Sequence, residues 1–133
     1  MEDKILAAMK LFKSGDDDAA IAQLLDESKE LVPAIVEIFH AEPDPDLRAF
    51  LVRAAWERHE ELSGEFILKA LNDPAEEVWQ SALDGAVALA SPEMLDALKS
   101  LRLQEQADAS MTRRFQMCID EAILYVEGLV RRG

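Results

Sequence analysis

The sequence predicts an all-α fold, and three observations lead to this prediction. Alanine, leucine and glutamate are abundant among the 133 residues, whereas glycine and proline occur five times each and aromatic residues make up only 6%. Apolar residues recur at intervals of three and four, which is the spacing of a helix with one buried face. No segment gives a strand signal of comparable strength. The apolar stripes that predict eight helices span residues 5–12, 20–25, 35–39, 47–55, 66–71, 78–89, 94–98 and 115–126.

Helix-breaking residues separate the first four stripes. Gly15 predicts a stop, and the acids Asp16–Asp18 that follow it favour the N-terminus of the next helix, where the helix dipole attracts negative charge. Pro43 cannot continue the third helix. Asp44-Pro45 is a capping residue followed by a proline at the first helical position, so it predicts the start of the fourth helix.

Similar signals divide the second half. Ser63 is predicted to cap the fifth helix, Asp73-Pro74 to open the sixth as Asp44-Pro45 opens the fourth, and Ser91-Pro92 to open the seventh. Residues 104–110 are polar and predict the longest loop, although their alanine and glutamine also suit a frayed helix end. The last helix is expected from about Met111 to Val130.

The chain repeats itself about every 30–40 residues. A shift of 31 aligns the apolar residues of 47–55 with those of 78–86, a shift of 32 aligns 35–39 with 67–71, and a shift of 36 places 83–87 on 119–123. Two-helix repeats of this length are typical of an α-solenoid, in which each pair buries its apolar face against its neighbours. We therefore expect about four helical hairpins, with an irregular eight-helix bundle as the alternative.

Two segments resemble a HEAT repeat. Leu31–Phe39 has a proline early in the first helix, and Pro43–Leu51 has Asp and Pro in the turn and an aliphatic residue followed by arginine in the second helix. The next unit keeps the turn Asn72–Pro74 and the aliphatic Val78, but has Trp79 in place of arginine. The resemblance implies a single HEAT-like domain over the whole chain, a right-handed superhelical stack, and a concave surface lined by the second helices.

Length and charge limit the range of functions. A chain of 133 residues predicts one domain. The net charge of −13 opposes binding to nucleic acid, because phosphate contacts require cations. Residues 1–91 hold 20 acids and eight bases, so the acidity lies in the first two thirds. It serves either as a solubilising surface or as a face for a basic partner.

Composition also indicates where the protein resides. No apolar stretch approaches the ~18 residues of a membrane span, and the acidic N-terminus does not resemble a secretory signal. Cys118 is the single cysteine, so we expect a reducing cytoplasmic location and, with only two separated histidines, no metal site.

The repeat alignment predicts which residues of the second helices face the groove. Members of each set lie four positions apart and hence on one helix face. An Arg53–Asp84 ion pair is expected to connect the first two helices. As a binding row this face could receive Arg, Lys or hydrogen-bonding groups of a protein; otherwise it is the solvated side of three amphipathic helices. The sets are Ala49, Arg53 and Glu57; Gln80, Asp84 and Ala88; and Gln116, Asp120 and Leu124.

Three further residues could serve either in core packing or in function. Trp56 and Trp79 are expected to pack in the core, with Trp56 as the alternative candidate for an exposed interface anchor. Cys118 aligns with the core position of Ala82 and is expected to be a buried, inert thiol.

The sequence therefore predicts a non-enzymatic module that binds a protein partner, of unknown oligomeric state and without a cofactor. No nucleophile motif, glycine-rich phosphate loop or zinc motif is present. An acidic inhibitor or immunity-like protein that covers a basic site is the more specific hypothesis. The alternatives, implied by HEAT-like relatives, are a DNA glycosylase-type enzyme and a lyase-like scaffold subunit.

Overall fold

The computed structural model describes residues 2–24, 30–58, 60–102 and 109–132, and these residues form eight helices and no strand. The all-α prediction is therefore confirmed for this part of the chain. The helices are α1 (Glu2–Lys13), α2 (Asp17–Ala22), α3 (Leu31–Ala41), α4 (Pro45–Arg58), α5 (Glu60–Ala70), α6 (Glu76–Leu89), α7 (Pro92–Leu101) and α8 (Ala109–Arg132).

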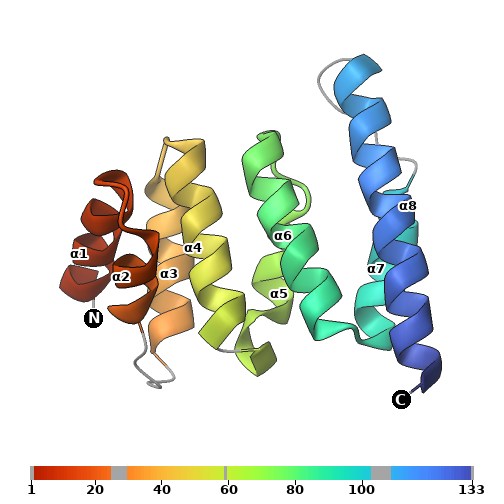
Figure 1. Ribbon diagram of the computed structural model, residues 1–133, viewed down its shortest axis with the longest axis horizontal. Coiled ribbons are helices and arrows are strands. Elements are labelled where there is room, and N and C mark those ends of the chain that lie inside the picture. The colour runs from red at the N-terminus through yellow and green to blue at the C-terminus, as the bar shows by residue number, and fades with distance from the viewer. Residues whose placement is uncertain (1, 25–29, 59, 103–108, 133) are drawn as a thin grey trace.

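The helices stand side by side in a row, with the two termini at its opposite ends (Figure 1). Consecutive helices pack as pairs: α1 with α2, α3 with α4, α5 with α6, and α7 with α8. From the second pair onward the pairs form two layers, because α3, α5 and α7 contact one another in sequence, as do α4, α6 and α8. The helices α4, α6 and α8 thus form one continuous layer.

The apolar stripes meet in a core that runs along the whole row. Phe12 of α1 stacks on Phe50 of α4, with ring centroids 4.8 Å apart. Phe39 and Phe66 make an edge-to-face contact at 5.0 Å that joins α3 to α5. A second edge-to-face contact, between the rings of Trp79 and Phe115 at 5.0 Å, joins α6 to α8. The core prediction for Trp79 is confirmed, since the residue is fully buried.

Ion pairs also connect each helix pair to the next. They lie near the amino-terminal ends of α4, α6 and α8, which share one edge of the row (Figure 1). The Arg48–Asp73 pair, 3.3 Å between Nη2 and Oδ1, is the least exposed of the three. The pairs are Lys13 with Asp44, Arg48 with Asp73, and Arg114 with Glu76.

Several predicted helix ends are confirmed. Gly15 has a positive φ of 91°, which glycine adopts without strain, and ends the first helical segment. The Asp16 carboxylate accepts a hydrogen bond from the Ala19 backbone N–H at the start of α2. The Ser91 hydroxyl accepts one from Met94 N–H, and Pro92 is the first residue of α7. Pro45 likewise begins α4.

Other helix ends differ from the prediction. Ser63 does not cap a helix: α5 already begins at Glu60, and Ser63 is buried inside it. Pro74 precedes α6 rather than opening it, because the Asp73 carboxylate accepts from Ala75 N–H and holds the chain in a turn up to Glu76. The predicted loop 104–110 falls mostly outside the described residues, and α8 begins at Ala109.

No helix in the described ranges combines the length and the apolar character needed to cross a membrane.

Candidate functional site: a groove across α4, α6 and α8

Two adjoining hollows lie on the layer formed by α4, α6 and α8. One, of about 550 Å³, lies between α4 and α6, and the other, of about 380 Å³, lies between α6 and α8. Gln80 and Asp84 line both hollows. The two hollows therefore adjoin at these residues of α6, and together we call them the α4–α6–α8 groove.

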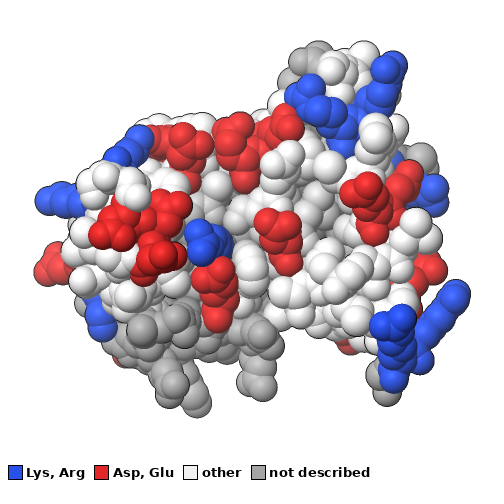
Figure 2. Space-filling view, viewed as in Figure 1, with Lys and Arg blue, Asp and Glu red and all other residues white. Residues whose placement is uncertain are grey.

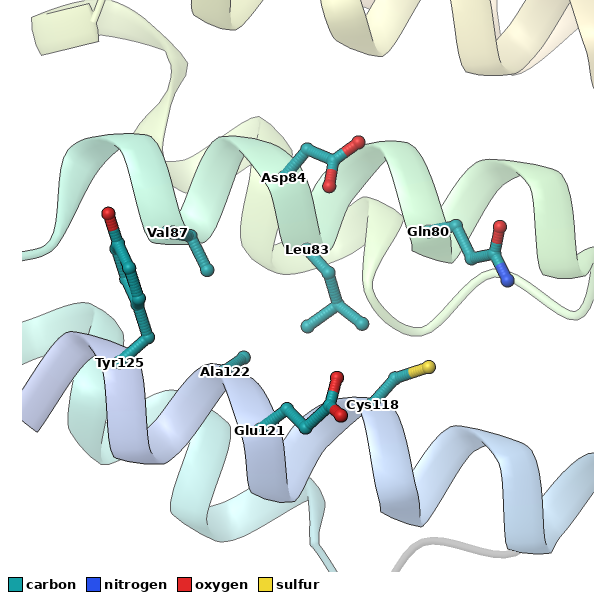
Figure 3. Close-up of a pocket in the computed structure, with 8 residues that line it drawn as sticks. All are labelled: Gln80, Leu83, Asp84, Val87, Cys118, Glu121, Ala122 and Tyr125. Atoms are coloured by element: carbon teal, nitrogen blue, oxygen red, sulfur yellow. The ribbon is translucent and has the colours of Figure 1, made fainter.

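The hollow between α6 and α8 has an apolar floor and a polar rim. Figure 3 shows the side chains of Leu83 and Val87 pointing from α6 toward Ala122 of α8. The ring of Tyr125 rises from α8 at one end, and Tyr125 is 58% exposed. The polar residues of this hollow are Gln80, Asp84, Cys118 and Glu121.

The hollow between α4 and α6 contains Trp56. This residue is partly buried and packs against the core, as expected, while it also lines the groove. A Cβ atom at Gly85 would lie 2.8 Å from Trp56 Cδ1 and 2.9 Å from the terminal methyl of Ile67. Glycine at position 85 thus allows the indole to lie directly on α6. The indole N–H of Trp56 is buried and has no hydrogen-bond partner in the described structure.

The groove carries an excess of negative charge. Among the described residues, its lining includes four carboxylates and one cation, Arg53. The Nε of Arg53 lies 3.0 Å from Oε1 of Glu57, so this cation is already neutralised within its own helix. No ion pair within the described ranges involves the remaining carboxylates, which are Glu77, Asp84 and Glu121.

Figure 2 shows this charge distribution on the surface. Acidic side chains are spread over α4 and α6 and continue onto the middle of α8, while basic side chains gather toward the two ends of α8. Asp84 is central to the groove, and burial raises the pKa of its carboxyl above the ordinary value of 3.8. The groove would therefore attract cations and repel anions.

Four of the six predicted contact residues line this groove. They are Arg53, Glu57, Gln80 and Asp84. The expected Arg53–Asp84 ion pair is wrong, since the guanidinium of Arg53 instead pairs with the carboxylate one turn further along α4. Gln80 also donates to the Glu76 carboxylate at 3.1 Å.

The α8 residues of the groove differ from those predicted. Asp120 points toward α7, where its Oδ1 lies 2.8 Å from Nε of Arg102, and neither Asp120 nor Gln116 lines the groove. Alignment by a shift of 36 placed α8 in the wrong rotation about its axis. A spacing of three and four among the small and aromatic residues could have revealed the correct face: Cys118, Ala122 and Tyr125.

The other members of the predicted rows do not line the groove. Ala49 is half-buried, and its carbonyl accepts a hydrogen bond from the Ser81 hydroxyl at 3.0 Å. Ala88 is exposed, and Leu124 is 72% exposed. The groove residues that sequence analysis missed are Glu77, Ser81, Leu83, Val87, Cys118, Glu121, Ala122 and Tyr125.

Cys118 is half-buried and lines the groove, so its assignment to a fully buried position is wrong. Burial, aided by the negative charges of Glu121 and Glu76, raises the pKa of the thiol. The thiol is thus mostly protonated near neutral pH, which does not favour a nucleophilic role. Of the two histidines that the sequence analysis judged too isolated for a metal site, His59 falls outside the described residues. In the ranges that the structure covers, no three His, Cys, Asp or Glu side chains gather to hold a metal ion.

Comparisons with family models, with curated proteins and with solved structures gave no match to this chain.

Proposed function

We propose that the chain is a HEAT-like α-solenoid with a right-handed superhelical stack. Support comes from the two layers of successive helix pairs and from the ion pairs that connect one pair to the next. Arg48 supports it further: its guanidinium donates to the carbonyls of Glu42 and Pro43 in its own turn and to Asp73 in the following turn. In a solenoid each pair contacts its neighbours in this repeated manner.

We propose that the function is non-enzymatic binding of a basic protein through the α4–α6–α8 groove. The observation that carries this proposal is a set of three carboxylates that form no ion pair with any described residue and line the groove on two helices: Glu77, Asp84 and Glu121. A partner with Lys or Arg at its contact surface would supply the missing positive charge.

An inhibitory or immunity-like role follows from the same feature. A protein with net charge −13 and a groove of this sign would associate quickly with a basic site and cover it. We further propose the reducing cytosol as its location, because the single cysteine leaves no internal disulfide to be formed.

A capture experiment with matched variants tests the groove. The immobilised full chain, a groove variant (E77Q/D84N/E121Q) and a control variant (E37Q/E65Q/D96N) are exposed to cell lysate at low salt and at 0.5 M salt. Both variants lose three negative charges, but the control changes exposed residues of the other layer, on α3, α5 and α7.

The expected result is a basic protein that the unmodified chain and the control retain at low salt, that the groove variant loses, and that 0.5 M salt releases. Salt at 0.5 M shortens the Debye length to roughly 4 Å, so an electrostatic contact weakens. Equal capture by all three chains would contradict the proposal. A shift of DNA by the protein at 20 mM salt would instead support the glycosylase-type alternative.

A further inference from the structure

We propose that the hollow between α6 and α8 receives one arginine side chain of the basic partner. This inference rests on the proposed function and specifies the chemistry of its central contact. The hollow encloses about 380 Å³, which is near the lower limit for pockets that bind small ligands. It suits a single side chain better than a folded segment, which would need the whole groove.

The floor of the hollow fits the stem of the arginine. Leu83, Val87 and Ala122 offer only methyl and methylene groups there, contributed by both helices (Figure 3). Long cationic side chains bury their aliphatic stems along apolar surface while the charged group stays near water. The same floor would also accept an apolar side chain, so the choice of arginine depends on the rim.

The rim of the hollow carries the negative charge of Glu121 on α8, whereas Figure 3 shows the carboxylate of Asp84 on the side of α6 that is turned away from α8. Asp84 belongs to α6 and Glu121 to α8, and neither carboxylate forms an ion pair with another described residue. A guanidinium presents five N–H donors in a planar arrangement, so it can donate to the Glu121 carboxylate through two parallel N–H groups. An ammonium group, with its compact and strongly hydrated charge, cannot form such a paired contact.

Tyr125 adds a reason to prefer arginine over lysine. Its ring flanks the hollow (Figure 3), and more than half of its surface is exposed although the residue is large and mostly apolar. A guanidinium stacks on an aromatic face through its own plane and through cation–π attraction. The apolar floor would thus contact the aliphatic stem of one arginine side chain, the acidic rim its charge, and the Tyr125 ring the plane of its guanidinium group.

Titration of the full-length, ¹⁵N-labelled protein with N-acetyl-arginine N-methylamide tests this assignment. The analogous citrulline derivative, which has the same shape without charge, and the lysine derivative are titrated in parallel. The expected result is saturable amide shifts confined to residues 80–88 and 118–126, weaker binding of lysine and no binding of citrulline. Equal binding of citrulline, or shifts spread over all helices, would overturn the assignment.

Exposed residues allow variants that preserve the fold. Glu121→Gln and Tyr125→Ala should each raise the Kd for the arginine derivative about two- to fivefold, as expected for one exposed charge or ring. The matched controls Glu65→Gln and Leu124→Ala change exposed residues outside the hollow and should leave the Kd unchanged. An unchanged Kd in all four variants would contradict the pocket.

The two proposals can fail separately. If the groove variant no longer captures the basic partner but the arginine derivative does not bind, the arginine pocket is wrong and the proposed function stands. If the arginine derivative binds as expected but the groove variant still captures every protein that the unmodified chain captures, the proposed function is wrong.

Discussion

At the scale of single residues, substitution of two glycines by alanine is expected to change the stability in opposite directions. Gly85 lies in the middle of α6, where an added Cβ would be 2.8 Å from the Trp56 ring, whereas at Gly128 in α8 an added Cβ meets nothing within 4 Å. Gly85→Ala should therefore lower the free energy of unfolding by about 1–2 kcal/mol, because overpacking exceeds the gain in helix propensity.

Gly128→Ala is the matched control and should raise the free energy of unfolding by about 0.5–1 kcal/mol. Urea denaturation of both variants measures the difference. A stabilising Gly85→Ala would show that α4 and α6 are not in such close contact.

Asp84 gives a prediction on pH. Its pKa is raised by burial, so the ionised carboxylate is less stable in the folded chain than in the unfolded chain. This penalty is present at neutral pH and disappears as the pH falls through the raised pKa to below 3.8. We expect Asp84→Asn to have a Tm slightly above that of the unmodified chain at pH 7, and the difference to vanish near pH 3.

Thermal unfolding by circular dichroism at a series of pH values checks this prediction. Because Asp84 is also exposed to solvent in part, the effect should be small. Asp96→Asn, at an exposed site for which no such burial applies, serves as the control. A lower Tm of Asp84→Asn at pH 7 would mean that the carboxylate has a stabilising partner.

At the scale of helices and turns, Arg48 holds two successive turns together. Its Nη1 lies 3.1 Å and 3.0 Å from the carbonyl oxygens of Glu42 and Pro43, and its Nη2 lies 3.3 Å from Asp73. Since the arginine side chain is only 17% exposed, Arg48→Met should lower the free energy of unfolding by about 2–3 kcal/mol, measured by urea denaturation.

Arg48→Lys should recover less than half of this loss, because an ammonium group cannot reproduce the planar arrangement of donors. Arg102→Met removes a cation that is 58% exposed in its pair with Asp120, and should cost less than about 1 kcal/mol. Equal losses in Arg48→Met and Arg102→Met would contradict a structural role for the turn contacts.

The sequence was sufficient for the helices but not for their rotation. Apolar spacing and capping residues such as Ser91-Pro92 act locally, so they predicted the number of helices and several helix ends. The start of α5 was missed because the local preference of Ser63 for a cap is overridden by burial of the residue inside the helix. The face of α8 was wrong by one position, because the rotation of this helix is set by burial of Phe115, Ile119 and Val126 against other helices, which no local pattern reveals. With this rotation Asp120 lies next to Arg102, the residue that follows α7.

At the scale of the whole molecule, the charge and the arrangement of helix pairs support the same interpretation. The central pairs have neighbours on both sides, whereas the α1/α2 pair and α8 lie at the ends of the row (Figure 1). The groove therefore extends from α4 and α6, whose pairs have neighbours on both sides, to α8 at the end of the row. Its composition could be predicted for α4 and in part for α6, where Gln80 and Asp84 were found but Glu77 and Ser81 were missed, and not for α8.

Because helices in the middle of the row contact more neighbours than those at its ends, we expect them to open locally less often. The most extensive contact between two helices is that of α4 with α6, and hydrogen exchange of these two helices should be the slowest in the molecule. Exchange should be fastest in the short helix α2 and at the ends of α8, since terminal elements open with the least loss of buried surface. Hydrogen–deuterium exchange read out by mass spectrometry measures this order.

Ala20→Gly tests whether the pairs respond separately. Ala20 is fully buried in α2, and the substitution should weaken that helix by about 1 kcal/mol. In a row of pairs that contact only their neighbours, exchange should accelerate in α1 and α2 while the rates in α6, α7 and α8 stay the same. Equal acceleration in all eight described helices would instead indicate one cooperative unit, because a closed bundle transmits a local loss of stability to every helix.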